Sequence, residues 1–572
     1  MKSLTGLDAT FLYLETPEMP MHVGSLNLCE LPAGFKGSFH KAVQHHIASR
    51  MHLAPVFSRK LVFMPFDLGH PLWVEAESVD IEFHIRRVPC SAKKPMTLAQ
   101  AHTTVAQLHS ELIDRAHPLW EFYVFDAIKL PSGQVVGGFF SKIHHAALDG
   151  KGGVMLANAM LDVGPVPREV PPPDPARRGK TAADLKVGKM IGSVFSNSMA
   201  QVAKLAKSLP AAAGTLGSTL AKQSLQGAGG RPKMPMKLAP KTPFNTSIAQ
   251  SRVFVAATIP LAECKAMGKA VGGSFNDVAL WICSTALRSY LANHGGVPTK
   301  SMVAAMPVSL REAGASDAAN LGNQVSMTLV ELGTHLAHPL KRMNAIMAST
   351  AKVKTSMQSL KGLLPTDYPS LLAPWLVGGA AKAALNAYGK TGLASRLPMV
   401  ANLAISNVPG PPVALYLAGA KIVSFHPLSI VLHGLALNIT IQTYAGHVDF
   451  GIVAGKKALP HAQDLARAIE AAFKEAQALL GDSTVDAASL RKPTASVKTR
   501  KAAVAKETPL EKSLSKKKVT RPNTGAVANN TKKSNVSNHG TTRAKAVKNE
   551  TAKKPSARQA RRPAAQRVAA GA

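Results

Sequence analysis

Residues 144–150, with the sequence HHAALDG, fit an HHxxxDG pattern whose residue types suit proton transfer. A histidine side chain can take up a proton near neutral pH because its ordinary pKa is about 6.5. We expect His145 to act as a general base, since an alcohol is a poor nucleophile until its proton is removed. His144 is expected to orient the loop, Asp149 to support it, and Gly150 to permit a tight turn. Paired histidines also occur as metal ligands or as hydrogen-bonded core residues, and the pattern alone leaves these alternatives open.

The elements around the histidine pair are predicted from apolar runs and turn residues. Residues 122–128 and 135–143 are apolar and are joined by 131–133 (PSG), which predicts a β-hairpin. The pair therefore lies at the exit of a buried strand. Residues 152–161 have the composition of a helix start, so backbone N–H groups of its first turn can face the site. Apolar residues at helical spacing predict another helix over 100–114.

From residue 4 to about 480, the chain resembles the bacterial wax ester synthase/diacylglycerol acyltransferase family. The resemblance depends on separated motifs whose joint, ordered occurrence is more specific than any one of them. These motifs are 7–9 (LDA), 11–12 (FL), 20–24 (PMHVG), 118–120 (PLW), 144–150 (HHAALDG), 276–277 (ND), 307–311 (PVSLR) and 406–411 (SNVPGP).

The resemblance implies an α/β fold of two chloramphenicol acetyltransferase-like sandwich domains. In such a fold, mixed sheets are flanked by helices and the active-site tunnel lies between the domains. A chain of 572 residues with 46% hydrophobic residues is long enough for two domains and a large core. The predicted parts are an N-terminal acyltransferase domain at 1–163, a Pro-rich linker with an amphipathic connecting helix at 164–240, a C-terminal acyltransferase-like domain at 241–481, and a disordered Lys/Arg-rich tail at 482–572.

Strand and helix patterns recur in the second half, as this fold class requires. The predicted strands are 253–259, 302–307, 325–332 and 401–406, with a hairpin of 437–444 and 448–453. A long apolar helix is expected over 278–291 and a closing helix over 462–480.

The implied activity is O-acyl transfer in storage neutral-lipid synthesis. A fatty acyl group would pass from acyl-coenzyme A to a long-chain alcohol, giving a wax ester, or to diacylglycerol, giving triacylglycerol. His145 would deprotonate the hydroxyl, and the alkoxide would attack the thioester directly. No acyl-enzyme is required, and no GxSxG nucleophile elbow lies near the histidine pair. No cofactor and no metal are expected, because acyl-coenzyme A is a co-substrate.

The resemblance also implies that Asn276 reaches the tunnel, where it stabilises the oxyanion or orients substrate. Asn and Asp are favoured N-cap residues as well, so the Asn276-Asp277 pair could instead begin the helix, and both roles can hold at once. The residues expected to bind substrate are Pro118, Leu119, Trp120 and Asp277.

Two further segments have expected structural roles. Residues 406–411 have a turn-forming composition, and the resemblance implies that they help to hold the two halves together. Arg311 is a candidate ion-pair partner for Asp149.

The formal net charge of +35 is unevenly distributed. Residues 483–572 contain 22 Lys and Arg but 4 Asp and Glu, and no aromatic residue, so this tail holds about half of the excess. It cannot bury enough apolar surface to fold by itself. A polybasic arm can bind anionic lipid or nucleic acid, or it can simply be a solvated tail that aids solubility.

Residues 184–209 carry apolar side chains at a period of about 3.6, interspersed with lysines, which predicts an amphipathic basic helix. Such a helix can lie in a membrane interface or pack on the protein as an inter-domain connection.

Four scattered cysteines without CxxC pairs argue against a disulfide framework or a zinc site and suit a reducing compartment. No secretory signal and no spanning segment are expected. We therefore expect a cytoplasmic protein that associates peripherally with the inner membrane or with lipid droplets.

Alternative functions follow from the same features. The scaffold could transfer acyl groups to a polyketide diol, or join carrier-bound peptides, although no carrier domain is attached. A protein of another class, a lipid-droplet scaffold, could tether neutral lipid to membrane or nucleic acid through the basic tail.

Overall fold

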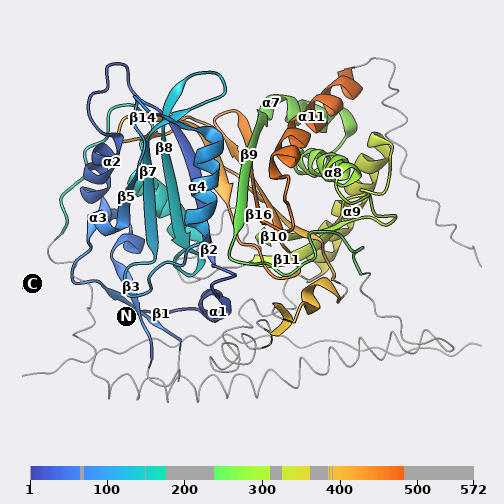
Figure 1. The fold of residues 1–572 in the computed structure, drawn as a ribbon, viewed down its shortest axis with the longest axis horizontal. Helices are drawn as coiled ribbons and strands as arrows, with labels where there is room; N and C mark the ends of the chain where they lie inside the picture. Colours follow the sequence, from blue (N-terminus) through green and yellow to red (C-terminus); the bar gives the residue numbers. More distant parts are fainter. Residues whose placement is uncertain are drawn as a thin grey trace, which may run out of the picture. The chain divides into compact units, whose positions relative to one another are not determined.

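The computed structural model describes residues 2–64, 70–148, 150–174, 238–309, 325–360, 384, 387–389, 391–397 and 399–481. Contacts divide the chain into two units, residues 1–494 and 495–572, and every described residue belongs to the first. Two mixed sheets with helices on their faces dominate this first unit (Figure 1).

The first sheet follows the order β13-β14-β2-β8-β7-β5, with β6 beside β7. The strands β5 and β6 run parallel to β7, and the other neighbours are antiparallel. Its strands are β2 (His22–Glu30), β5 (Ile85–Val88), β6 (Met96–Thr97), β7 (Trp120–Lys129), β8 (Val135–His144), β13 (Tyr416–Leu417) and β14 (Ala420–Leu428).

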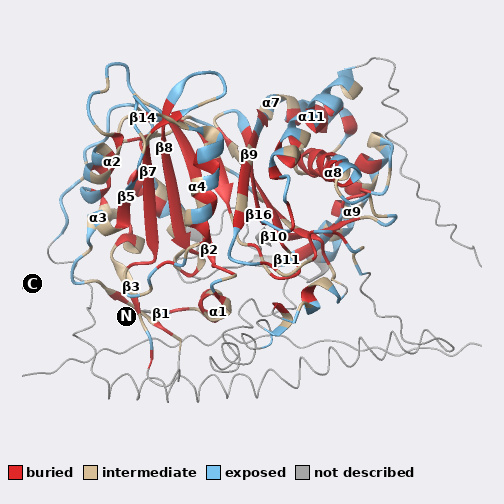
Figure 2. Ribbon diagram, in the orientation of Figure 1, coloured by how far each residue is buried: buried red, intermediate tan, exposed pale blue. Residues whose placement is uncertain are grey.

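Both faces of the first sheet are covered, which is why β7 reads as a nearly continuous apolar run. Successive strand side chains point to opposite faces. Phe122 and Val124 accordingly pack in one core cluster with helices α2 (Phe39–Ala48) and α5 (Gly150–Met160), while Tyr123 and Phe125 pack in another with α4 (Leu98–Ser110). Figure 2 shows these strands buried between helices with exposed outer faces.

The second sheet follows the order β11-β10-β12-β15-β16-β9. Its strands are β9 (Arg252–Pro260), β10 (Val303–Ser309), β11 (Val325–Glu331), β12 (Leu403–Val408), β15 (Leu437–Tyr444) and β16 (His447–Gly455). Helices α7 (Leu261–Val271), α8 (Phe275–Asn293), α9 (Pro339–Leu360) and α11 (Ala462–Gly481) share its main core. Of the 19 residues of α8, 13 are buried, because the sheet and neighbouring helices surround it.

The remaining described elements are small. A three-stranded sheet consists of β1 (Lys2–Ser3), β4 (Leu72–Glu75) and β3 (Arg59–Val62). The remaining short helices are α1 (Gly6–Leu14), α3 (Ile81–His84), η1 (Met51–Leu53), η2 (Pro55–Phe57), η4 (His145–Ala147) and η9 (Leu393–Ser395).

One core cluster contains residues of both large sheets. The helix α4 lies between them and contacts β9 (Figure 1). In the same cluster, Val105 of α4 packs with Phe254 and Val453 of the second sheet. Where β14 meets β16, a Cβ on Gly451 would lie 1.6 Å from the carbonyl oxygen of Pro427. Only glycine permits this close approach between the sheets.

Sheet membership does not follow the predicted domain limits. Residues 416–428 fall within the predicted C-terminal domain, 241–481, yet they form β13 and β14 at the edge of the first sheet. In β14, Phe425 pairs with Asn27 of β2. A long-range strand pairing of this kind leaves no local signal, so the ranges 1–163 and 241–481 remain predictions of domain limits and do not describe the sheets.

The predicted hairpin at 122–143 is confirmed as β7 and β8, which pair antiparallel, and the helix expected at 152–161 is α5. The predicted strands of the second half correspond to β9, β10, β11, β12, β15 and β16. The predicted helix at 184–209 and the tail at 482–572 lie outside the described residues. No helix in the described ranges is long and apolar enough to cross a membrane.

Candidate active site

His145 is the first residue of η4, directly after β8. Its backbone N–H donates to the carbonyl oxygen of Met21 over 2.8 Å. Its imidazole stacks on the ring of Phe11, which belongs to α1, with centroids 4.0 Å apart and planes 11° apart. Backbone and ring are therefore both fixed, one by the residue preceding β2 and the other by α1.

The environment of His145 keeps its ring neutral. Mainly through burial, the pKa of His145 is lowered to about 4; its own backbone carbonyl acts in the opposite direction, and the nearby His144 adds to the lowering. Nδ1 is buried without a hydrogen-bond partner, although the residue as a whole is half-buried. An unprotonated imidazole is the form that a general base requires at neutral pH.

His144, the last residue of β8, is fully buried. Its backbone N–H donates to the carbonyl oxygen of Leu119 over 3.0 Å. Its Nδ1 accepts the N–H of Ala146 over 3.1 Å, so the neutral ring carries its proton on Nε2. Nε2 lies 3.3 Å from Oε1 of Glu15. These contacts place both ring nitrogens of His144 against protein atoms, and the predicted orienting role stays a prediction.

Glu15 is a part of the site that sequence reasoning missed. Its side chain is 2% exposed and lies 3.2 Å from Nε2 of His22 as well as beside His144. Burial alone would raise the pKa of Glu15, but polar contacts with His144 and His22 outweigh burial and hold that pKa well below its usual range. The available signal was a single carboxylate at the end of the apolar run 11–14 (FLYL), between two of the motifs.

The predicted substrate-binding residues Pro118, Leu119 and Trp120 are buried, and Trp120 begins β7 directly after the other two. The Trp120 indole N–H donates to the carbonyl oxygen of Phe57 over 3.1 Å. The carbonyl of Leu119 is the acceptor for His144. These contacts position residues 144–147, which we call the histidine loop. That Pro118, Leu119 and Trp120 bind substrate stays a prediction.

The Asn276-Asp277 pair lies in the first turn of α8, but the N-cap is Ser274. Asp277 completes a capping box with Ser274 and accepts the hydroxyl of Thr350 over 2.7 Å. The expectation that Asn276 and Asp277 supply the N-cap is thus wrong by two to three positions, because the cap side chain must precede the first helical turn. With both carboxylate oxygens bonded inside the protein, Asp277 has a structural role here, and its part in substrate binding stays a prediction.

Asn276 contacts the second sheet. Nδ2 of Asn407, on β12, donates to Oδ1 of Asn276 over 3.3 Å. This contact orients the amide and leaves Nδ2 of Asn276 available as a donor. Within the described residues no hydrogen bond joins Asn276 to His145. The 406–411 motif therefore has a specific partner in the 276–277 motif.

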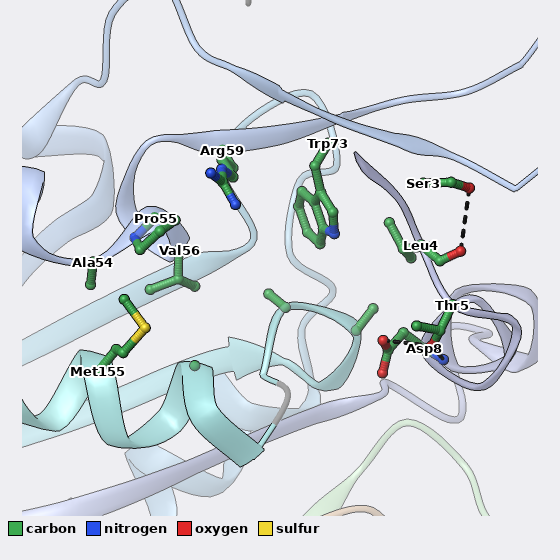
Figure 3. A pocket seen from close by; sticks show the side chains of 13 residues that line it. Ser3, Leu4, Thr5, Asp8, Ala54, Pro55, Val56, Arg59, Trp73 and Met155 are labelled. Carbon is green, nitrogen blue, oxygen red and sulfur yellow. Dashed lines mark hydrogen bonds between the residues drawn. The ribbon is translucent and has the colours of Figure 1, made fainter. Parts of the chain in front are cut away.

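A pocket of about 230 Å³ lies behind the histidine loop. Figure 3 shows Trp73, Met155 and Asp8 around it, and Ala146 and Ala147 of η4 complete its lining. Ligand pockets usually measure about 300–1,000 Å³, so this one can hold a segment of a substrate. His145 itself is not among the lining residues.

Comparison with known proteins assigns the chain. Residues 4–279 match the wax ester synthase/diacylglycerol acyltransferase catalytic domain, and residues 321–477 match the C-terminal domain of the same proteins. A putative diacylglycerol O-acyltransferase of Mycobacterium tuberculosis is 33% identical over 479 residues, covering 84% of this chain and 100% of the relative. The chain belongs to the wax ester synthase/diacylglycerol acyltransferase family.

Other members of this family agree. The O-acyltransferase WSD of Acinetobacter baylyi is 31% identical over 479 residues, covering 82% of this chain and 96% of that protein. The solved wax ester synthase/diacylglycerol acyltransferase of Marinobacter aquaeolei VT8 superposes with a TM-score of 0.58 at 26% identity, covering 84% of this chain and all of that one. The predicted two-part α/β fold is confirmed, and the chain is an acyltransferase of neutral-lipid synthesis.

Gly150, Asp149 and Arg311 are the remaining residues predicted to lie around the histidine pair. Gly150 begins α5, and its predicted part in a tight turn stays a prediction. Asp149 and Arg311 lie outside the described residues, so their proposed ion pair stays a prediction. No group of three or more His, Cys, Asp or Glu in the described ranges is arranged to hold a metal ion.

Proposed function

We propose that this acyltransferase moves a fatty acyl group from acyl-coenzyme A to the hydroxyl of a long-chain alcohol or a diacylglycerol, with His145 as the general base. The main support is the neutral imidazole of His145, held between its backbone bond to Met21 and the ring of Phe11. The description of the family, wax ester synthase/diacylglycerol acyltransferase, and the name of the Mycobacterium tuberculosis relative favour these acceptors.

The reaction needs one base and one direct transfer. A ring nitrogen of His145 takes the hydroxyl proton as the alcohol oxygen bonds to the thioester carbonyl carbon. The tetrahedral intermediate collapses, the carbon–sulfur bond breaks, and the coenzyme A sulfur receives the proton from His145. The products are an ester and free coenzyme A, and the imidazole returns to its neutral state.

Asn276 is our candidate for stabilising the negative oxygen of that intermediate. Because Asn407 donates to Oδ1, the Nδ2 group of Asn276 is the part of the amide that can donate to an oxyanion. The buried cysteines offer no competing nucleophile, since burial raises the pKa of Cys264 and of Cys283 to about 12.

The test is acyl transfer from palmitoyl-coenzyme A with hexadecanol and dioleoylglycerol offered separately, followed by chromatography of the labelled ester. A positioned base contributes roughly 10²–10⁴ in rate, so His145→Ala should lose that factor while keeping its circular dichroism spectrum. The exposed His447 supplies a control, and His447→Ala should keep full activity. Full activity of His145→Ala would eliminate the mechanism.

We also propose that the enzyme works at an anionic lipid surface, reached through its basic tail. The charge of residues 483–572 supports this, since each Lys or Arg near such a surface contributes about 1 kcal/mol. Flotation with vesicles of anionic or neutral phospholipid should recover the full chain with the anionic set, and a chain ending at residue 482 with neither. Equal recovery of both chains would contradict the proposal, and retention by nucleic acid alone would favour the other partner.

A further inference from the structure

We propose that Glu15 is a positioning residue for the acyl transfer, which holds the histidine loop through Met21 and His144. The inference rests on the proposed role of His145. Glu15 is a buried carboxylate that lies about 130 residues before His145 in the sequence, and it contacts both Met21, whose carbonyl oxygen binds His145, and His144.

The first connection passes through the backbone of Met21. The Met21 N–H donates to Oε1 of Glu15 over 3.0 Å, and the Met21 carbonyl oxygen accepts the N–H of His145 over 2.8 Å. One peptide segment is therefore held by Glu15 on one side and holds His145 on the other. A shift of the carboxylate would be transmitted directly to the main chain of the proposed base.

The second connection passes through His144. Since Nδ1 of this ring accepts the N–H of Ala146, the proton lies on Nε2, which is 3.3 Å from Oε1 of Glu15 in an electrostatic contact without hydrogen-bond geometry. A carboxylate in this place favours the Nε2–H tautomer, as second-layer carboxylates commonly do for functional histidines. The tautomer in turn keeps Nδ1 free to hold the first turn of η4.

Arg115 fixes the carboxylate from the other side. Its Nη2 and Nε donate to Oε2 of Glu15 over 2.7 and 3.2 Å, and Nη2 also donates to the carbonyl oxygen of Leu12 over 2.9 Å. The two carboxylate oxygens thus have separate tasks, because Oε2 is bound by the guanidinium and Oε1 faces Met21 and the histidines. A charged carboxylate is needed, because the Met21 N–H donates to Oε1 and the Arg115 guanidinium donates to Oε2.

Glu15→Gln tests whether the two carboxylate oxygens have these separate roles, because the substitution hardly changes the volume of the side chain. The amide must place its NH₂ group against either Arg115 or the Met21 side, and each choice sets donor against donor. A displacement of about 1 Å in a catalytic group can cost on the order of 10² in rate. We therefore expect kcat to fall roughly 10- to 100-fold, with the KM values for both substrates within a factor of about two.

The matched control is Asp162→Asn. Asp162 is also a buried carboxylate bound to arginine, Arg50 at 2.9 Å and Arg168 at 2.9 Å. Its described contacts do not include the histidine loop. This variant should lose stability but keep kcat per folded molecule, which separates a positioning effect from the general cost of a broken buried pair.

A spectroscopic readout does not depend on turnover. In protein labelled with ¹⁵N-histidine, the His144 ring should show the Nε2–H tautomer, and Glu15→Gln should shift that ring toward a mixture of the two tautomers.

If Glu15→Gln fails to fold, Arg115→Gln replaces it, because Arg115 is partly exposed and its loss frees Oε2 alone. The expected loss of kcat is then roughly 3- to 10-fold, a fraction of the full displacement.

The outcomes separate the inference from the proposed function. If His145→Ala keeps its activity, the proposed role of His145 as the general base fails whatever Glu15 does. If His145→Ala is inactive while Glu15→Gln, or Arg115→Gln in its place, keeps kcat within a factor of two of the wild type, the inference on Glu15 is overturned. Equal losses of kcat per folded molecule in Glu15→Gln and Asp162→Asn would also overturn it.

Discussion

The ring of Phe11 lies almost parallel to the imidazole of His145, at a centroid distance of 4.0 Å. This stacking joins the first helix of the chain to the proposed base and restricts rotation of the imidazole about its own bonds. It also contributes to the burial that lowers the pKa of His145.

Removing the stacked ring should impair catalysis more than binding. In Phe11→Ala the imidazole gains freedom, so kcat should fall roughly 10-fold, whereas Phe11→Leu, which keeps apolar bulk, should fall less. The measurement is steady-state transfer from palmitoyl-coenzyme A. Phe83 stacks on His117 at 4.1 Å outside the site and serves as the control. A loss in Phe83→Ala equal to that in Phe11→Ala would argue against a specific role.

The acid side of the pH profile should lack the inflection of an ordinary histidine. A base acts in its unprotonated form, so activity falls only when pH drops toward the pKa of that group. Because burial lowers the pKa of His145 to about 4, kcat/KM should be constant on its acid side from pH 8 to pH 5.5. An acid limb near pH 6.5 would contradict this environment for His145.

Asn276→Ala and Ser274→Ala should separate catalysis from capping. Loss of an oxyanion donor typically costs about 10²–10³ in kcat, so Asn276→Ala should lose activity with little change in melting temperature. Loss of the N-cap costs about 1 kcal/mol of stability, so Ser274→Ala should melt earlier and keep kcat. If Asn276→Ala instead melts earlier at unchanged kcat, its role is structural.

Buried neutral histidines should make the protein acid-sensitive. Burial lowers the pKa of His22 and of His426 to about 4, and that of His102 to about 3. The unfolded chain binds more protons below pH 6.5, so stability that is present above pH 6.5 is lost as pH falls toward 4. As the pH is lowered from 7 to 5.5, each of these three histidines should lower the free energy of unfolding by about 1 kcal/mol. The measurement is urea unfolding at constant ionic strength.

Asp449 acts in the opposite direction and provides the control for that slope. It accepts the hydroxyl of Thr258 over 2.6 Å and the N–H of Phe425 over 2.8 Å, where the two sheets meet. Burial raises its pKa to about 6, so its contribution is greatest below about pH 4 and is lost as pH rises through 6. Asp449→Asn removes this opposing contribution, so the free energy of unfolding should fall more steeply as the pH is lowered from 7 to 5.5. An unchanged slope would contradict the assignment.

The sequence by itself determined the local elements of the site. The nearly continuous burial of β7 and β8 follows from the apolar runs that predicted a hairpin, because strand side chains point to both faces of a sheet that is covered on both sides. The position of His145 at a strand exit and the helix that follows were likewise readable from neighbouring residues. Ordered motifs, from 7–9 to 406–411, were sufficient for the family.

Tertiary structure alone decided which distant residues meet. Nothing near Glu15 in sequence shows that it contacts His144 and Arg115, and nothing near Asn407 shows that it orients Asn276. The addition of β14 to the first sheet, across the predicted domain limit, has the same origin. Propensity and periodicity describe interactions within a few residues, whereas these contacts form only when packing of the two sheets brings remote segments together. Their desolvation then fixes the charge state of the buried groups.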